Sequence, residues 1–246
     1  MLKLLQRGQL IASIDRVGPN CFQSFEILIE RCSQAQDILS IFTLPRSMFR
    51  HQGKDRTVKH NMQIAIVLSF VAGIVNAAGF LAIRQLTTNV TGHFALFISD
   101  LSDFQFWKGT IYFLYILSFL LGAFASGLLI ELFRENRKLN VYVLPTIIES
   151  VLLMAVALLS NVEGFLHSDM IACLLLFAMG LQNSFVTKIS DAVVRTTHLT
   201  GLFTDLGIEL SQLFFPNSHP DREHLKSTIR LRIYIITFFF AGGLVG

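Results

Sequence analysis

Long apolar runs follow one another along most of the chain. Five of them are nearly free of charge and predict membrane-spanning helices at about 62–83, 110–133, 141–160, 169–187 and 229–246. Runs of about 18–22 apolar residues match the roughly 30 Å hydrocarbon core of a bilayer. The pattern therefore predicts an all-α, polytopic membrane helix bundle.

Two further stretches, about 87–102 and 196–214, are only half apolar. They contain the segments TTNVTGHFALFISDLS and TTHLTGLFTDLGIELS, in which hydroxyl, imidazole and carboxylate side chains are spread among apolar ones. A charged side chain at the centre of a bilayer costs about 2.5–3.5 kcal/mol even on insertion scales. We therefore expect both stretches to face protein, water or a ligand.

The two ends of the chain differ from its middle. Residues 1–60 are polar, and Phe22, Phe25 and Ile29 recur there at helical spacing, which indicates an amphipathic, cytoplasmic N-terminal extension. Residues 61–246 form the predicted transmembrane domain. Its last apolar run stops at AGGLVG without a polar flank, which is the pattern of a chain cut short, and a further helix would then be missing.

The composition agrees with a membrane protein. Hydrophobic residues make up 52% of the 246 residues and charged residues only 15%, whereas soluble domains carry about 25% charged residues. This excludes a secreted disulfide-rich domain, a disordered chain and an ordinary cytosolic enzyme. The net charge of +3 lies mostly between the apolar runs, so it indicates membrane topology and argues against nucleic acid as a partner.

No sequence motif supports an enzyme. The HExxH, GxSxG and P-loop patterns are absent. Cys21, Cys32 and Cys173 have neither metal-ligand nor CxxC spacing. We therefore expect no catalytic residue, no cofactor and no metal site.

The two halves of the transmembrane domain share a pattern that indicates an internal duplication. FVAGIVN, which begins at Phe70, matches FAMGLQN, which begins at Phe177, with Phe, Gly and Asn in register. The later segments TGHFALFISDLS and TGLFTDLGIELS align without a gap. Because polar as well as apolar positions recur, we expect repeat 1 at about 62–133 and repeat 2 at about 169–246.

The distribution of Lys and Arg residues distinguishes a parallel from an inverted repeat. If the two half-apolar stretches cross the membrane, the Lys and Arg residues from Lys54 onward divide almost evenly between the two sides. If the stretches re-enter, all of these residues except Arg84 and Lys108 collect on the N-terminal side. Cytoplasmic loops carry an excess of positive charge. This favours a cytoplasmic N-terminus and an inverted repeat with two short Thr-Gly half-helices, a design common in secondary transporters.

Four dispersed motifs resemble those of a known family. FVAGIVNAAGFLAI, TTNVTGHF, FAMGLQNSFV and TTHLTGLF lie within about residues 62–246 and resemble the YoaK family of bacterial multi-pass membrane proteins, whose function is uncharacterised. The family typically has an Asp where this chain has Asn76, and an Asn where it has His93 and Leu202 after each Thr-Gly. If that Asp carries a proton or a cation in the family, this chain lacks the carboxylate that would couple the ion to its function. The resemblance implies a multi-pass protein of the bacterial inner membrane and no known substrate.

Polar residues within the apolar segments are the candidate site. An uncharged polar side chain there either bonds a neighbouring helix or contacts a solute, and both interpretations stay open. The candidate substrate-binding residues are Asn76, Thr91, Gly92, His93, Asn183, Thr200 and Gly201.

Two carboxylates are candidates for a coupling charge. Glu149 stands in the middle of VYVLPTIIESVLLMAVALL with no basic residue in the same helix. Such a carboxylate is protonated, paired with another helix or functional. Asp205 lies inside its half-apolar stretch and is a candidate ligand for an ion or solute.

Together these features predict transport of a small polar or anionic solute. Its site would lie at the membrane midplane, between the two Thr-Gly segments and the helices that carry Asn76 and Asn183. The competing hypothesis is a membrane-embedded interaction protein whose N-terminal region binds a partner, with the polar repeat serving only helix packing. The expected partners are the lipid bilayer and the solute, and a homo-oligomer stays open.

Overall fold

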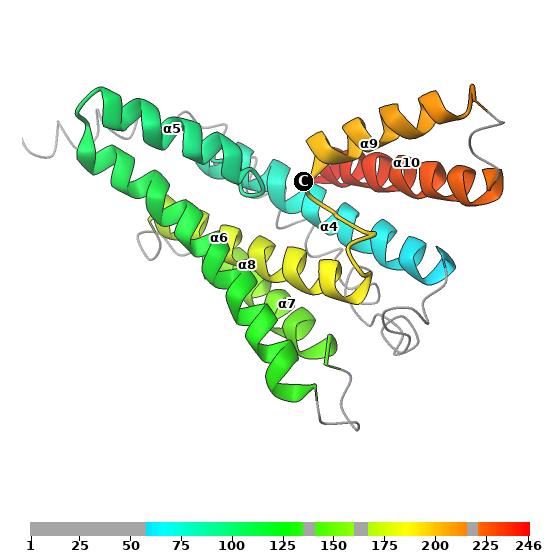
Figure 1. Ribbon diagram of the computed structural model, residues 1–246. Helices are drawn as coiled ribbons and strands as arrows, with labels where there is room; N and C mark the ends of the chain where they lie inside the picture. The colour runs from blue at the N-terminus through cyan, green and yellow to red at the C-terminus, as the bar shows by residue number, and fades with distance from the viewer. Residues whose placement is uncertain (1–57, 135–140, 160–166, 216–220) are drawn as a thin grey trace, which may run out of the picture. The chain divides into compact units, whose positions relative to one another are not determined.

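The structure is a computed structural model, and it describes residues 58–134, 141–159, 167–215 and 221–246. All of these belong to one of the chain's two compact units, Ile41–Gly246. The described ranges contain seven α-helices and no strand (Figure 1): α4 Val58–Ile83, α5 Val90–Ser102, α6 Phe106–Phe133, α7 Val143–Leu159, α8 Ser168–Ile189, α9 Leu199–Gln212 and α10 Arg222–Val245. The predicted extension, residues 1–60, lies outside the described residues except for the first turn of α4.

Four helices in the described ranges, α4, α6, α8 and α10, are long and apolar enough to cross a membrane. They coincide with four of the five predicted spans, and the shorter apolar helix α7, with 17 residues, coincides with the fifth. The predicted all-α, polytopic membrane helix bundle is confirmed. Helix α10 begins at Arg222, earlier than predicted, because the side chain of Asp221 caps it by accepting a hydrogen bond from the main-chain N–H of His224.

The two half-apolar stretches contain short helices preceded by irregular backbone. Helix α5 has 13 residues and α9 has 14, so each is about 20 Å long at 1.5 Å per residue. That is shorter than the hydrocarbon core of a bilayer. Each packs against the helix that follows it, α5 on α6 and α9 on α10.

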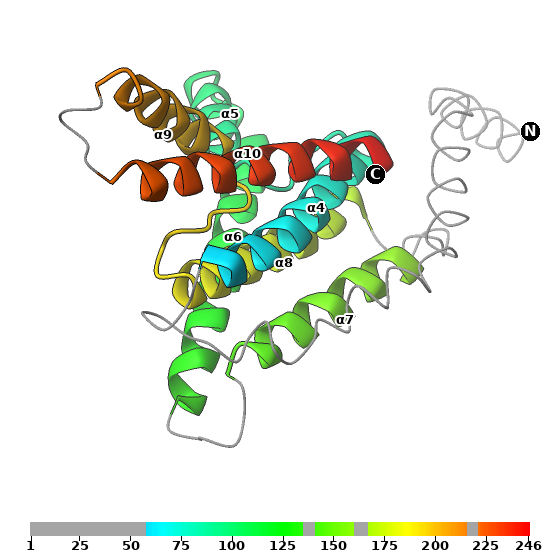
Figure 2. The ribbon, with the colours of Figure 1, turned by 90° about the vertical axis from the view of Figure 1, so that its right-hand side faces the viewer.

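The long helices form two closely packed pairs, α4 with α10 and α6 with α8 (Figures 1 and 2). Glycines at the crossings bring the backbones together. A Cβ on Gly73 of α4 would overlap the carbonyl oxygen of Phe239 on α10, and a Cβ on Gly122 of α6 would overlap that of Phe177 on α8. Small residues at a helix crossing permit such close approach.

Within each pair the helices run in the same direction. Tyr115, about a third of the way along α6, donates to Asp169 at the start of α8 at 2.5 Å. Near their ends, Lys188 of α8 donates to Glu131 of α6 at 2.6 Å. In the other pair, Gly242 at the end of α10 lies against Phe70 of α4, and Gly246, four residues later, lies against Ile74, also four residues later. The two helices therefore run in the same direction.

The two pairs run in opposite directions and meet where α4 packs on α8. One buried cluster joins the first half of α4, from Ile64 to Leu68, to the end of α8, from Phe185 to Ile189. A second cluster joins Val71–Val75 to Ala178 and Met179. Because later positions of α4 meet earlier positions of α8, these two central helices are antiparallel.

Candidate functional site

Both central helices are followed by a chain segment that turns sharply. Arg84, directly after α4, has a φ of 57°, and Asp191 and Ala192, shortly after α8, have φ of 53° and 63°. Left-handed backbone of this kind is uncommon for residues other than glycine and is typical of abrupt helix ends. The turns direct segments 84–89 and 190–198 back along α4 and α8, and their threonines hold them there.

Two threonines fasten segment 84–89 to α4. Thr87 is fully buried, and its hydroxyl donates to the main-chain oxygen of Val75 at 3.0 Å. The hydroxyl of Thr88 donates to Oδ1 of Asn76 at 2.7 Å. Both acceptors precede Ile83, the end of α4, by about two turns, so the segment returns by about 12 Å along the helix.

Segment 190–198 is fastened to α8 in the same way. The hydroxyl of Thr197 donates to Oδ1 of Asn183 at 2.8 Å. The neighbouring Gln182 is fully buried, and its Nε2 donates to Oγ1 of Thr196 at 2.9 Å and to the main-chain oxygen of Leu68 at 3.0 Å. Gln182 therefore connects α8, α4 and the returning segment. We call the Thr88–Asn76 and Thr197–Asn183 contacts the two Thr–Asn pairs.

The two Thr–Asn pairs approach the centre of the bundle from opposite ends, because α4 and α8 are antiparallel. The bond from Gln182 to Leu68 shows that Asn183 lies near the height of Leu68 on α4. Asn76 lies eight residues beyond Leu68, about 12 Å along the axis. The predicted site residues Asn76 and Asn183 therefore belong to two separate clusters along the same pair of helices.

The predicted Thr-Gly elements lie in the first turns of α5 and α9. Thr91 and Thr200 are exposed. The main-chain N–H of Gly92 donates to Oδ1 of Asn89 at 3.0 Å, which caps α5, and Gly201 occupies the corresponding turn of α9. The hydroxyls that reach Asn76 and Asn183 come from Thr88 and Thr197, which precede the Thr-Gly elements. Binding of a solute by the four Thr-Gly residues stays a prediction.

His93 is buried between α5 and α6, with 2% of its surface exposed. Its Nε2 lies 2.7 Å from the main-chain oxygen of Leu86. Its ring lies edge-on to Tyr115 at 5.1 Å and is stacked on Tyr112 at 6.0 Å between centroids. These contacts hold segment 84–89 against α6, while its Nδ1 has no hydrogen-bond partner.

Asp205 belongs to an ion-pair cluster between α9 and α10. The guanidinium of Arg232 contacts Oδ2 of Asp205 at 2.9 Å and Oε2 of Glu209 at 2.8 Å. The side chains of Arg232 and Glu209 are only 18% and 13% exposed, whereas that of Asp205 is 45% exposed. The carboxylate of Asp205 is therefore engaged in holding α9 on α10.

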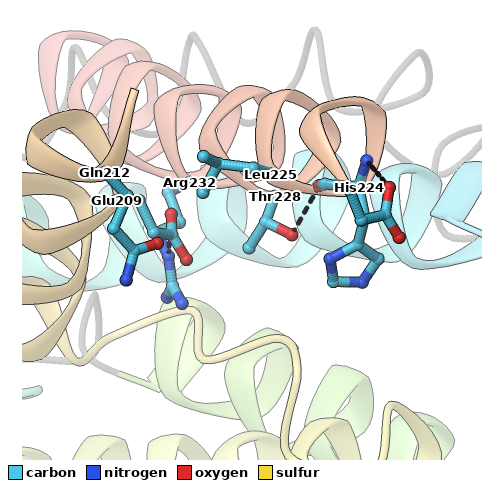
Figure 3. A pocket seen from close by; sticks show the side chains of 7 residues that line it. Glu209, Gln212, His224, Leu225, Thr228 and Arg232 are labelled. Carbon is cyan, nitrogen blue, oxygen red and sulfur yellow. Dashed lines mark hydrogen bonds and ion pairs between the residues drawn. The ribbon is translucent and has the colours of Figure 1, made fainter. Parts of the chain in front are cut away.

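An open pocket of about 500 Å³ borders this cluster (Figure 3). It is lined by Glu209, Gln212, Asp221, His224, Leu225, Thr228 and Arg232. Several of its polar groups already bond within the protein: Thr228 donates to the main-chain oxygen of His224, and Arg232 holds Glu209. The polar start of α10 and the end of α9 therefore form the pocket walls, and hydrogen bonds made by their side chains hold these walls in place.

Glu149 is a buried ionisable group on α7. It is 2% exposed, and its Oε1 has no hydrogen-bond partner. No salt bridge in the described ranges includes it. The same ranges contain no group of three or more His, Cys, Asp or Glu side chains that could hold a metal ion.

The sequence pattern identified the two asparagines but did not identify the threonines that build the two clusters. The hydroxyls of Thr87, Thr88, Thr196 and Thr197 make the bonds, and none of these threonines was among the predicted site residues. A signal was present, since a Thr-Thr pair precedes each Thr-Gly element. The threonines of the Thr-Thr pairs point toward α4 and α8, whereas Thr91 and Thr200 are exposed, and the sequence alone does not show this difference in direction.

Residues 64–246 match the model of a family described as protein of unknown function, DUF1275. YoaK belongs to that family, so the resemblance carried by the four motifs is confirmed. No curated protein and no solved structure matches the chain.

Proposed function

Since the chain belongs to the DUF1275 family of proteins of unknown function, its activity has to be inferred from the site, and we propose that it transports a small polar or anionic solute across the bacterial inner membrane. The observation that carries the proposal is the presence of two Thr–Asn pairs that enter the bundle from opposite ends. Secondary transporters place interrupted segments at corresponding positions of two halves in this way, with the solute site between them.

Irregular backbone at membrane depth has a specific physical meaning. Non-helical main chain is tolerated inside a membrane where it is buried in protein or lines a polar cavity, because lipid satisfies none of its hydrogen bonds. Segments 84–89 and 190–198 are held in this position by buried threonines. Next to them, Oε1 of Gln182 and Nδ2 of Asn183 are buried without partners and offer an acceptor and a donor to a solute.

The helix directions support a bundle of five crossings in the membrane. Helices α4 and α10 run one way and α6 and α8 the other, so α7 has to cross between α6 and α8. Helices α5 and α9 then leave the membrane on the side from which their segments enter. In this arrangement every Lys and Arg from Lys54 onward, except Arg84 and Lys108, faces the cytoplasm, in agreement with the positive-inside rule.

Matching contacts support an inverted duplication as the origin of this arrangement. Asn76 and Asn183 both accept from the second Thr of a Thr-Thr pair. In each half the first helix, α4 or α8, packs through a glycine on the third helix of the other half, α10 or α6. Two copies of one three-helix unit, exchanged in this way, would produce both relationships.

The proposal is tested by thermal unfolding of the purified protein in detergent with a panel of amino acids, carboxylates, sugars and nucleosides. A bound solute stabilises the folded state by about 2.7 kcal/mol at 100 times its Kd. At least one member of the panel should raise Tm, and Asn183→Leu should abolish the effect. Thr110→Val is the matched control, because the exposed hydroxyl of Thr110 only bonds Phe106 of its own helix.

Two results would refute transport through this site. One is a panel in which no solute changes Tm. The other is stabilisation that persists unchanged in both Asn76→Leu and Asn183→Leu. Either result would leave the asparagines as residues that hold the returning segments in place.

A further inference from the structure

Seven polar side-chain atoms of the described residues are buried without a hydrogen-bond partner, and five of them belong to the four helices α4, α6, α7 and α8. These five atoms are Oγ of Ser69, Oγ of Ser126, Oε1 of Glu149, Oε1 of Gln182 and Nδ2 of Asn183. Buried polar atoms are normally paired, and each exception calls for an explanation. We call these five residues the polar layer, because the packing register places them at one height of the bundle.

The register of α4, α6 and α8 follows from direct contacts. Ser69 is next to Leu68, whose main-chain oxygen accepts from Gln182 of α8. Ser126 is next to Gly127, where an added Cβ would contact Oγ of Ser184, the residue after Asn183. Three helices therefore bring members of the layer to the same height.

Helix α7 adds Glu149 at this height. Tyr142, before the start of α7, belongs to the cluster of Phe185 and Ile189 at the end of α8. Leu152 and Leu153 pack against the cluster of Ala178 and Met179 in the middle of α8. Glu149 lies between these two contacts along α7, so its carboxyl lies near the height of Gln182.

Charged groups on the helices packed around α7 are all near the ends of the bundle. On α6 and α8 the Tyr115–Asp169 contact lies toward one end and the Glu131–Lys188 pair toward the other. Between these two contacts, α8 carries the thiol of Cys173, and α6 also carries the phenol of Tyr112, near Tyr115. Helix α4 has no ionisable residue from Asn61 to Ile83. Among the described residues of α4, α6, α7 and α8, Glu149 is therefore the only carboxyl at the height of the polar layer.

The polar layer contains partners for both protonation states of a carboxyl group. A protonated Glu149 needs an acceptor, and Oε1 of Gln182 accepts without donating. An ionised Glu149 needs donors, and Nδ2 of Asn183 donates without accepting, while the hydroxyls of Ser69 and Ser126 do either. A carboxyl kept permanently protonated for structural reasons would need only the acceptor.

From this juxtaposition we infer that Glu149 binds and releases a proton within the polar layer, and that the proton is the ion coupled to transport. On uptake, the carboxylate forms one O–H bond with a proton from water on one side of the membrane. On release, that bond breaks and the proton leaves to water on the other side. The coupling rests on the proposed function, whereas protonation of Glu149 can be measured without any solute.

The test uses infrared difference spectra of the full-length protein in lipid vesicles, recorded between acidic and alkaline buffer with no solute present. A protonated carboxylic acid in an apolar site has a carbonyl band separate from that of ionised carboxylates. We expect the wild-type protein to gain this band on acidification, and Glu149→Gln to lose it. Glu131→Gln is the matched control, because Glu131 is an exposed carboxylate paired with Lys188, and it should leave the band unchanged.

A second variant keeps the test valid if Glu149→Gln does not fold. Glu149→Asp retains the acid and should shift the band without removing it, and Ser126→Ala should shift it by removing a hydroxyl from the polar layer. A wild-type spectrum without a pH-dependent carboxylic acid band, or a band that persists in Glu149→Gln, would overturn the inference. A solute panel that leaves Tm unchanged would instead overturn the transport proposal while the band remained, so the two failures are distinguishable.

Discussion

Gly122 of α6 lies against the main-chain carbonyl of Phe177 on α8, so closely that a Cβ on the glycine would overlap the oxygen. Gly180 of α8 makes the reciprocal approach to the carbonyl of Phe119 on α6. The contact involves main chain on both helices, and main chain of a packed helix has little freedom to move away. The distance between α6 and α8 is therefore set by these glycines.

We expect Gly122→Ala to destabilise the folded protein. Overpacking a well-packed contact costs about 1–3 kcal/mol, because neighbouring backbone has to shift. Thermal unfolding in detergent should show a lower Tm. Gly207→Ala is the matched control: Gly207 lies on α9 with nothing within 4 Å of the added Cβ, so that variant should be as stable as the wild type or slightly more stable. Equal Tm values for the two variants would contradict the close crossing.

We expect Thr88→Val and Thr197→Val to loosen the returning segments. Each change removes one hydroxyl donor to an asparagine, worth about 1 kcal/mol in a typical case. Tm should fall modestly, and hydrogen exchange of the main-chain amides in segments 84–89 and 190–198 should accelerate. Thr110→Val should change neither quantity, and an unchanged exchange rate in both site variants would argue against the Thr–Asn pairs.

We expect Arg232→Met to detach α9 from α10. The change leaves Glu209 partly buried without its cation, a cost of about 1–3 kcal/mol. Adding Glu209→Gln should recover part of the lost stability. Lys226→Met serves as the control, because its pair with the exposed Glu223 is a surface pair, worth at most about 1 kcal/mol. A double variant less stable than Arg232→Met alone would contradict the role of this pair.

We expect the C-terminal end of α6 and the start of α10 to lie on the same side of the membrane. Single cysteines at Arg134 and Glu223, in a chain lacking Cys21, Cys32 and Cys173, should react with an impermeant thiol reagent only after lysis of the cells. A cysteine at Lys108 should react in intact cells. Helices α7, α8 and α9 lie between these two positions, so labelling of positions 134 and 223 from opposite sides would mean that α9 crosses the membrane, and would refute the inverted arrangement.

The sequence was sufficient to predict the long helices, because their signal is local. A charge-free run such as 169–187 has few alternatives to a membrane helix, and the structure places α8 at Ser168–Ile189. Boundaries were less accurate where the helix extends beyond its apolar part, as at Arg222 of α10. The polar side chains of the half-apolar stretches indicated that neither is a plain lipid-facing helix, and the distribution of Lys and Arg favoured short half-helices; α5 has 13 residues and α9 has 14.

The site was predicted less well, because it depends on which side chains point inward. Asn76 and Asn183 were recognised as a matched pair, and both accept from a threonine. The sequence favoured Thr91 and Thr200 as their companions, whereas the structure uses Thr88 and Thr197. Likewise, nothing local identifies Arg232 as the partner of Asp205, since the two residues come from different helices and meet only after α9 folds back on α10.

The close packing of Gly73 on Phe239 has a consequence for biosynthesis. Helix α4 emerges from the ribosome long before α10, and chain elongation proceeds at about 5–20 residues per second. For that interval, the glycine face of α4 has no α10 to cover it and faces lipid or an insertion chaperone. Nascent chains arrested before α10 should therefore be recognised by membrane quality control even though their first helices are already inserted.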